Sequence, residues 1–60
     1  KVDTNSGEGG EVNVYDSSGN VLAHYYKYKQ KVYIITVPTG ADYLTFGYSD
    51  KVYEVAPYNP

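Results

Sequence analysis

The sequence predicts an all-β fold, a small antiparallel meander, sandwich or barrel of about five strands. Three observations predict it. Nine of the 60 residues are Tyr, and Tyr, Val, Ile and Thr dominate the middle of the chain, residue types that suit a pleated, half-buried surface. Short alternating runs recur between turn signals spaced about 8–12 residues apart. No stretch shows a sustained helical period.

The first half of the chain divides into a lead-in, two strands and a turn. Residues 1–10 are rich in Gly, Ser, Asn and acidic residues, and they predict a flexible lead-in or linker. Glu11–Tyr15 alternates, with its two valines on one face, and predicts a strand. Asp16–Asn20 predicts a turn, because Asp accepts backbone N–H bonds and Gly adopts positive φ easily. Val21–Tyr28 predicts the second strand. Its alternation leaves the core side open and groups Leu22, His24, Tyr26 and Tyr28 on one face and Val21, Ala23, Tyr25 and Lys27 on the other.

The second half is predicted to contain three more strands. Its elements are, in order, a reversal at Lys29–Gln30, a strand at Lys31–Val37 ended by Pro38, a corner at Thr39–Asp42, a strand at Tyr43–Tyr48, a hairpin turn at Ser49–Asp50, a strand at Lys51–Ala56 and an exit segment at Pro57–Pro60.

The stretch Lys31–Tyr48 is expected to be the folding centre, because it holds the only Ile-Ile pair, the only Phe and the most regular apolar spacing. We expect it to pair with the strand before it. A chain of this length has room for one domain, which we place at residues 11–56. The predicted core is Val12, Val14, Leu22, Ile34, Leu44, Phe46, Val52 and Val55, helped by some of the tyrosines.

Composition excludes several classes of site. The chain has no Cys, so a disulfide framework, a thiolate nucleophile and a Cys-ligated zinc site are excluded. With His24 as the only imidazole, a multi-His metal site is excluded too, and no cofactor is expected. A net charge of -2 argues against a dedicated DNA-binding domain. No apolar run approaches the roughly 20 residues of a membrane helix. The chain begins at Lys1 without Met, and we expect it to be a piece of a longer protein.

No catalytic constellation is visible. The serines lie in predicted loops or the lead-in, without a nucleophile-elbow pattern. The carboxylates sit mainly in turns, where solubilising and capping roles explain them. Asp16, Ser18 and Asn20 alternate as in a Ca²⁺ loop, but Val21 stands where such a loop needs Gly. An Asx turn is therefore the favoured reading, and no enzyme is predicted.

The segment His24–Tyr33 is chemically the most distinctive, because it interleaves Tyr with Lys. Exposed aromatic rings can stack on the apolar faces of sugars, and with basic neighbours they can stack on bases. The lysines can instead protect an edge strand against aggregation. Net negative charge disfavours nucleic acid. The candidate ligand-binding residues are His24, Tyr25, Tyr26, Lys27 and Tyr28.

Two pieces of the sequence carry a family resemblance. Val14–Leu22 holds a Tyr-Asp-x-x-Gly-Asn hairpin, and Ile35–Tyr48 holds an apolar-x-Val-Pro-x-Gly-Ala-x-x-Leu-x-Phe-Gly pattern. Together they resemble extracellular bacterial and phage β-sandwich modules, of the galactose-binding-like or Ig-like kind. A jelly roll of that type needs about eight strands and about twice this length. The resemblance implies a secreted or cell-surface, non-catalytic module, and no family binding residue is carried over.

The functional expectation is a non-catalytic extracellular binding module, of the kind found in adhesins. Its expected partner is a glycan or cell-surface polymer, held by exposed tyrosines and by hydrogen bonds from turn Asp and Asn residues. The alternative is a structural spacer or assembly domain that binds no small ligand and packs against neighbouring domains or as an oligomer.

Overall fold

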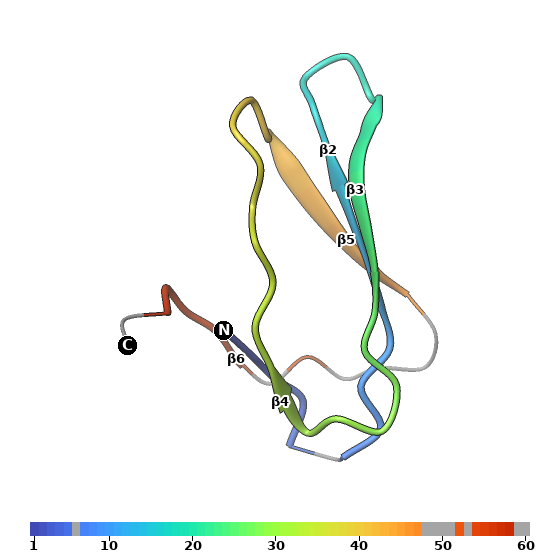
Figure 1. Ribbon diagram of the computed structural model, residues 1–60, viewed down its shortest axis with the longest axis vertical. Coiled ribbons are helices and arrows are strands. Elements are labelled where there is room, and N and C mark those ends of the chain that lie inside the picture. The colour runs from blue at the N-terminus through green and yellow to red at the C-terminus, as the bar shows by residue number, and fades with distance from the viewer. Residues whose placement is uncertain (6, 48–51, 53, 59–60) are drawn as a thin grey trace.

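The computed structural model describes residues 1–5, 7–47, 52 and 54–58 and is all-β, which confirms the predicted fold class (Figure 1). Among these residues, six strands form two antiparallel sheets of three strands each. The strands are β1 (Val2–Asp3), β2 (Glu11–Tyr15), β3 (Val21–Tyr26), β4 (Val32–Tyr33), β5 (Tyr43–Gly47) and β6 (Glu54–Val55). Within the described ranges, no helix is long and apolar enough to cross a membrane.

The larger sheet has the order β3-β2-β5, so β2 is its centre. Alternation along β2 sends Val12 and Val14 to the inner face, where both are 0% exposed. Their cross-strand neighbours on that face are Tyr25 and Ala23 in β3, and Phe46 and Leu44 in β5. The predicted strand at Glu11–Tyr15 is confirmed with its bounds, because a half-buried strand shows its period directly in the sequence.

The predicted turn between β2 and β3 is confirmed as an Asx turn. One carboxylate oxygen of Asp16 accepts the backbone N–H groups of Ser18 and Asn20, both at 2.9 Å. The other oxygen accepts the Asn20 side-chain amide at 3.1 Å, and Gly19 has φ 84°. The main-chain and side-chain amides of Asn20 hold the pKa of Asp16 below its usual value, because they stabilise the carboxylate form.

Residues 1–5 and 7–10 form part of the fold, where the sequence predicted a lead-in. Val2 is 1% exposed, and it pairs with β4 on one side and β6 on the other. Gly10 exchanges two main-chain hydrogen bonds with Lys27, at 3.1 and 2.6 Å. A Cβ on Gly9, whose φ is 66°, would lie 1.6 Å from the Lys27 carbonyl oxygen. The glycines therefore permit a close backbone crossing, and in sequence such a crossing looks the same as a flexible linker.

The reversal after β3 lies at Tyr28 and Lys29, within one residue of its predicted place. Lys29 adopts φ 61°, a left-handed conformation that is uncommon outside Gly and Asn. Its N–H donates to the Glu8 carbonyl at 2.6 Å, so the lead-in also anchors this turn.

The core lies between the two sheets. Val2, Val12 and Tyr33 form a buried cluster, and Tyr25, Ile35, Phe46 and Val52 pack against it. The predicted core residues Val12 and Val14 are confirmed, whereas Val2 and Tyr33 were not foreseen. Three predicted core residues are instead exposed, namely Leu22 at 40%, Ile34 at 45% and Val55 at 52%.

The stretch Lys31–Tyr48 does not form one pair of strands. Only Val32–Tyr33 of its first half joins a sheet, and that sheet is the smaller one. Tyr43–Gly47 lies in the larger sheet beside β2. The expected pairing of this stretch with the strand before it is wrong, because β3 pairs with β2 instead. The predicted turn at Ser49–Asp50 lies outside the described residues, as does part of the predicted last strand.

Candidate ligand-binding surface

The five predicted site residues are divided between the two sides of the sheet. In β3, His24 and Tyr26 lie opposite Asn13 and Glu11 of β2, on the outer face. Tyr25 lies opposite the buried Val12, on the inner face. Because side chains alternate along a strand, neighbours in sequence part in this way.

Tyr25 and Lys27 belong to the inner side. The Tyr25 hydroxyl donates to the Thr36 carbonyl at 2.6 Å, which ties β3 to the chain beyond β4. The Lys27 ammonium lies 6.0 Å from the centre of the Tyr25 ring, at the outer limit of a cation–π contact. Both side chains therefore have structural contacts away from the other three candidates.

His24, Tyr26 and Tyr28 form a continuous row of rings. The His24 and Tyr26 ring centres are 4.3 Å apart with an interplanar angle of 42°. The Tyr26 and Tyr28 centres are 6.0 Å apart and inclined by 22°. Tyr26 is 63% exposed and Tyr28 37% exposed. The row thus presents large apolar surface to solvent on a sheet face.

Glu11 joins this row from the neighbouring strand. The Tyr28 hydroxyl donates to one of its carboxylate oxygens at 2.5 Å. The other oxygen lies 3.7 Å from Nε2 of His24, an ion pair when the imidazole is protonated. Two members of the row therefore fix the carboxylate, and the carboxylate in turn holds them in place. Sequence reasoning missed Glu11 because its role depends on cross-strand pairing, and only its alternation in β2 pointed to the outer face.

A second aromatic pair lies farther along the same face. Tyr15 and Tyr43 are cross-strand partners, with ring centres 4.8 Å apart and planes within 14°. Between this pair and the row lie Asn13 and Thr45, which are also register partners. We call the whole set the aromatic face. Its members are Glu11, Asn13, Tyr15, His24, Tyr26, Tyr28, Tyr43 and Thr45.

The aromatic face can contact a ligand through apolar ring surface and through polar groups between the rings. Asn13 offers amide donors and an acceptor, and Thr45 offers a hydroxyl. The charge that touches the ring row is the Glu11 carboxylate, while Lys27 lies toward the inner side. The expectation was that turn Asp and Asn side chains bind ligand. In the β2–β3 turn, Asp16 and Asn20 bond to each other. Among the described residues, no three His, Cys, Asp or Glu side chains gather as a metal site would require.

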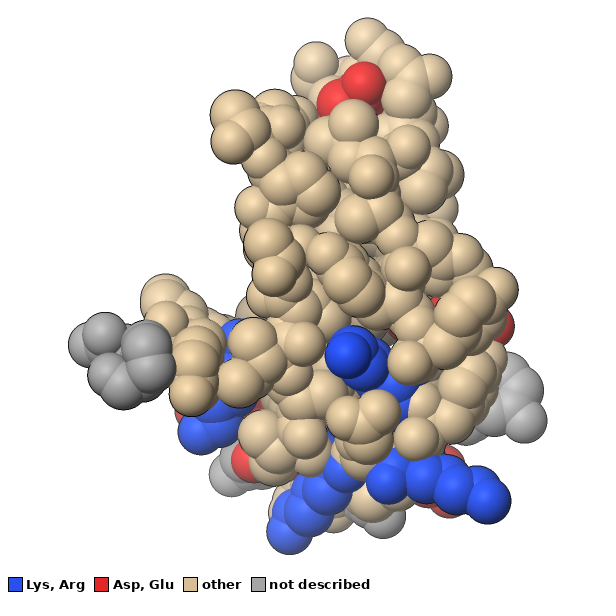
Figure 2. Space-filling view, viewed as in Figure 1, with Lys and Arg blue, Asp and Glu red and all other residues tan. Residues whose placement is uncertain are grey.

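The lysine side chains are distributed unevenly over the molecule. In the view of Figure 2, the lysine side chains gather over the half of the molecule that holds β4, and the end formed by the β2–β3 turn shows none. No family model, curated protein or solved structure matches this chain.

Proposed function

We propose that this protein is a non-catalytic binding module whose aromatic face stacks on the sugar rings of a neutral glycan. The observation that carries the proposal is the exposed ring row of His24, Tyr26 and Tyr28, braced by the Glu11 carboxylate. Fixed rings lose little conformational freedom when a ligand covers them, so more of the contact energy contributes to affinity.

The chemistry of the face favours a sugar over a phosphate-bearing ligand. The carboxylate of Glu11 would repel phosphate, whereas it accepts hydrogen bonds from sugar hydroxyls. Asn13 and Thr45 add donors and acceptors between the rings. The proposal includes an extracellular or cell-surface setting, where polymeric glycans are found, and it extends the resemblance to bacterial and phage surface modules.

Isothermal titration with neutral hexasaccharides of glucose and of N-acetylglucosamine tests the proposal. We expect binding to at least one of them, and a loss of about tenfold or more in affinity for Tyr26→Ala, equivalent to about 1.4 kcal/mol. Tyr58→Ala is the matched control, because Tyr58 is also half exposed, at 52%, but lies outside the larger sheet. Its affinity should equal that of the parent chain.

The competing function is the assembly or spacer domain. If neither hexasaccharide binds and the chain self-associates through Tyr26, the aromatic face is an assembly surface and the glycan proposal is wrong. Sedimentation velocity of the parent and of Tyr26→Ala across a concentration series distinguishes the two functions.

A further inference from the structure

The aromatic face has two ring platforms, one toward each end of β2. One platform is the ring row, whose member Tyr26 is the register partner of Glu11. The other is the stacked pair of Tyr15 and Tyr43. Because β2 is extended, Tyr15 lies about 13 Å beyond Glu11, at roughly 3.3 Å per residue. A sugar ring is about as large as a tyrosine ring, so a single sugar cannot cover both platforms.

The two platforms also lie toward opposite sides of β2. Tyr26 belongs to β3 and Tyr43 to β5, and these two strands flank β2. The line that joins the platforms therefore crosses the sheet diagonally, near Asn13 at the middle of β2. The corner beside Gly47, the register partner of Glu11 in β5, has no side chain that could stack. The rings thus mark one diagonal of the aromatic face.

Contacts within the fold hold both platforms in place. The Glu11 carboxylate braces the ring row. Tyr43 stacks on Tyr15, and its hydroxyl lies beside the β2–β3 turn, 3.8 Å from where a Cβ on Gly19 would be. Two fixed platforms can bind two sugars of one chain, because the second contact becomes intramolecular once the first has formed. Little conformational freedom of the rings is lost in either contact.

Polar side chains occupy the space between the platforms. Asn13 and Thr45 are register partners, and Thr45 is exposed. The Asn13 amide both donates and accepts hydrogen bonds, and so does the Thr45 hydroxyl. In a straight glycan chain the hydroxyl groups project from the edges of the sugar rings. A sugar that lies between the platforms can therefore form hydrogen bonds here while its neighbours in the chain stack on the rings.

We propose that the aromatic face binds the interior of a straight, β-linked glycan chain, which lies along this diagonal and stacks on both platforms. The inference rests on the proposed function and specifies its ligand class, a linear polymer in place of a single sugar or a chain end. Equatorial linkages keep such a chain straight and leave the apolar C–H faces of every ring exposed. An α-linked chain of the same sugar coils, so it cannot lie flat on both platforms at once.

Isothermal titration of the 60-residue chain with cellohexaose, chitohexaose and maltohexaose tests the linkage. The first two are β-linked hexamers of glucose and of N-acetylglucosamine, and the third is an α-linked hexamer of glucose. We expect the tighter of the two β-linked hexamers to bind about tenfold or more tightly than maltohexaose. Equal or tighter binding of maltohexaose would overturn the inference and leave the proposed function standing. If no hexasaccharide binds, both are wrong.

Tyr43→Val tests whether one glycan chain reaches both platforms, because Val suits a strand but has no flat ring. We expect affinity for the β-linked hexasaccharide to fall about tenfold. Unchanged affinity, with a loss in Tyr26→Ala, would overturn the inference alone, since one platform would then suffice. The unsubstituted protein gives a second test that needs no variant. The disaccharide of the same sugar should bind more than about tenfold more weakly than the hexasaccharide. A smaller ratio, which the number of binding registers along the longer chain explains, contradicts the inference.

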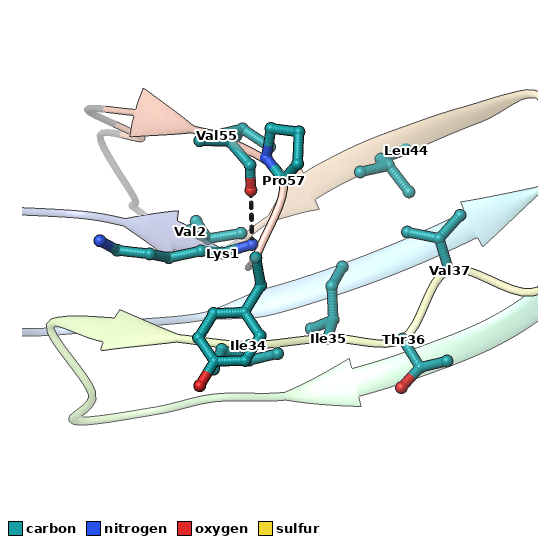
Figure 3. A pocket seen from close by; sticks show the side chains of 11 residues that line it. Lys1, Val2, Ile34, Ile35, Thr36, Val37, Leu44, Val55 and Pro57 are labelled. Atoms are coloured by element: carbon teal, nitrogen blue, oxygen red, sulfur yellow. Dashed lines mark hydrogen bonds between the residues drawn. The ribbon is translucent and has the colours of Figure 1, made fainter. Parts of the chain in front are cut away.

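Tyr58→Val is the matched control for Tyr43→Val. Tyr58 is 52% exposed and lines the cavity drawn in Figure 3, whose walls are mainly aliphatic side chains such as Ile34, Val37 and Leu44. Aliphatic walls offer sugar hydroxyls no hydrogen bonds, so affinity for the hexasaccharide should equal that of the parent chain. An equal loss in Tyr58→Val and Tyr43→Val would mean that the glycan does not lie along the diagonal, and the inference would be wrong.

Discussion

The two sheets use similar residue types in different ways. In the larger sheet the central strand β2 is five residues long, and its alternation separates the buried Val12 and Val14 from an outer sheet face with exposed rings such as Tyr26. In the smaller sheet the central strand β1 is two residues long, and Val2 is buried by pairing with β4 and β6, which are distant in sequence. A face of exposed aromatic side chains therefore needs strands long enough to alternate, whereas the burial of a single side chain does not.

The largest expected effect comes from Gly9→Ala, which breaks the close backbone crossing between Gly9 and Lys27. The new Cβ would meet the Lys27 carbonyl oxygen, a main-chain atom that cannot move aside cheaply. We expect a loss of about 3 kcal/mol or more in the free energy of unfolding, or failure to fold. Gly7→Ala is the control, because Gly7 also has positive φ but nothing within 4 Å of an added Cβ. It should cost about 1 kcal/mol. Equal costs in urea unfolding would mean that the crossing is not close in solution.

The second effect, smaller, tests whether the smaller sheet is part of the folded unit. Val2→Ala removes buried methyl groups, and we expect a loss of about 2 kcal/mol. Val21→Ala makes the same chemical change at an exposed position and should stay within about 0.5 kcal/mol. If both variants unfold at the same urea concentration, the smaller sheet is not part of the cooperatively folded unit.

The difference between these two valines also shows what the sequence could and could not predict. Alternation is a local signal, so it predicted β2 with its bounds and placed His24, Tyr26 and Tyr28 on one side. The burial of Val2 comes from β4 and β6, which are distant in sequence, and two residues are too few to show a period. Nothing local in a Gly-rich segment indicates such partners.

The candidate site was likewise predictable only where it depends on alternation within one strand. Its ring row follows from alternation within one strand, whereas Glu11 and the Tyr15–Tyr43 pair depend on which strands are neighbours. The sequence left a meander, a sandwich and a barrel open, and it predicted that Lys31–Tyr48 pairs with the strand before it. Instead β2 pairs with both β3 and β5, and this brings the second aromatic pair onto the face.

A third effect measures how firmly the aromatic face is braced. A double-mutant cycle of Glu11→Gln and Tyr28→Phe should show a coupling of about 0.5 kcal/mol in unfolding free energy, small because the Glu11 side chain is 33% exposed. In the double variant the free energy of hexasaccharide binding should fall by more than the free energy of unfolding does. The reason is that loosened rings must be ordered on binding. A coupling of zero in both readouts would show that the carboxylate does not brace the rings.

The smallest expected effect is a pH dependence at the turn that ends the aromatic face. The pKa of Asp16 is lowered in the folded state by hydrogen bonds from Asn20 and Ser18, so the folded state binds its proton less readily than the unfolded state does. Its stabilising contribution is therefore fully present above the ordinary value of 3.8, and it is lost as pH falls through the lower folded pKa.

Asp16→Asn keeps the shape of the side chain but removes the charge and one acceptor oxygen. We expect the parent chain to resist urea slightly better than this variant near neutral pH, and the difference to vanish in strong acid. Amide exchange should assign the loss to the β2–β3 turn, leaving Ile35 unaffected. A difference between the two chains that persists unchanged in strong acid would mean that the carboxylate charge does not hold the turn. In that case the end of the aromatic face depends on the shape of the Asx turn alone.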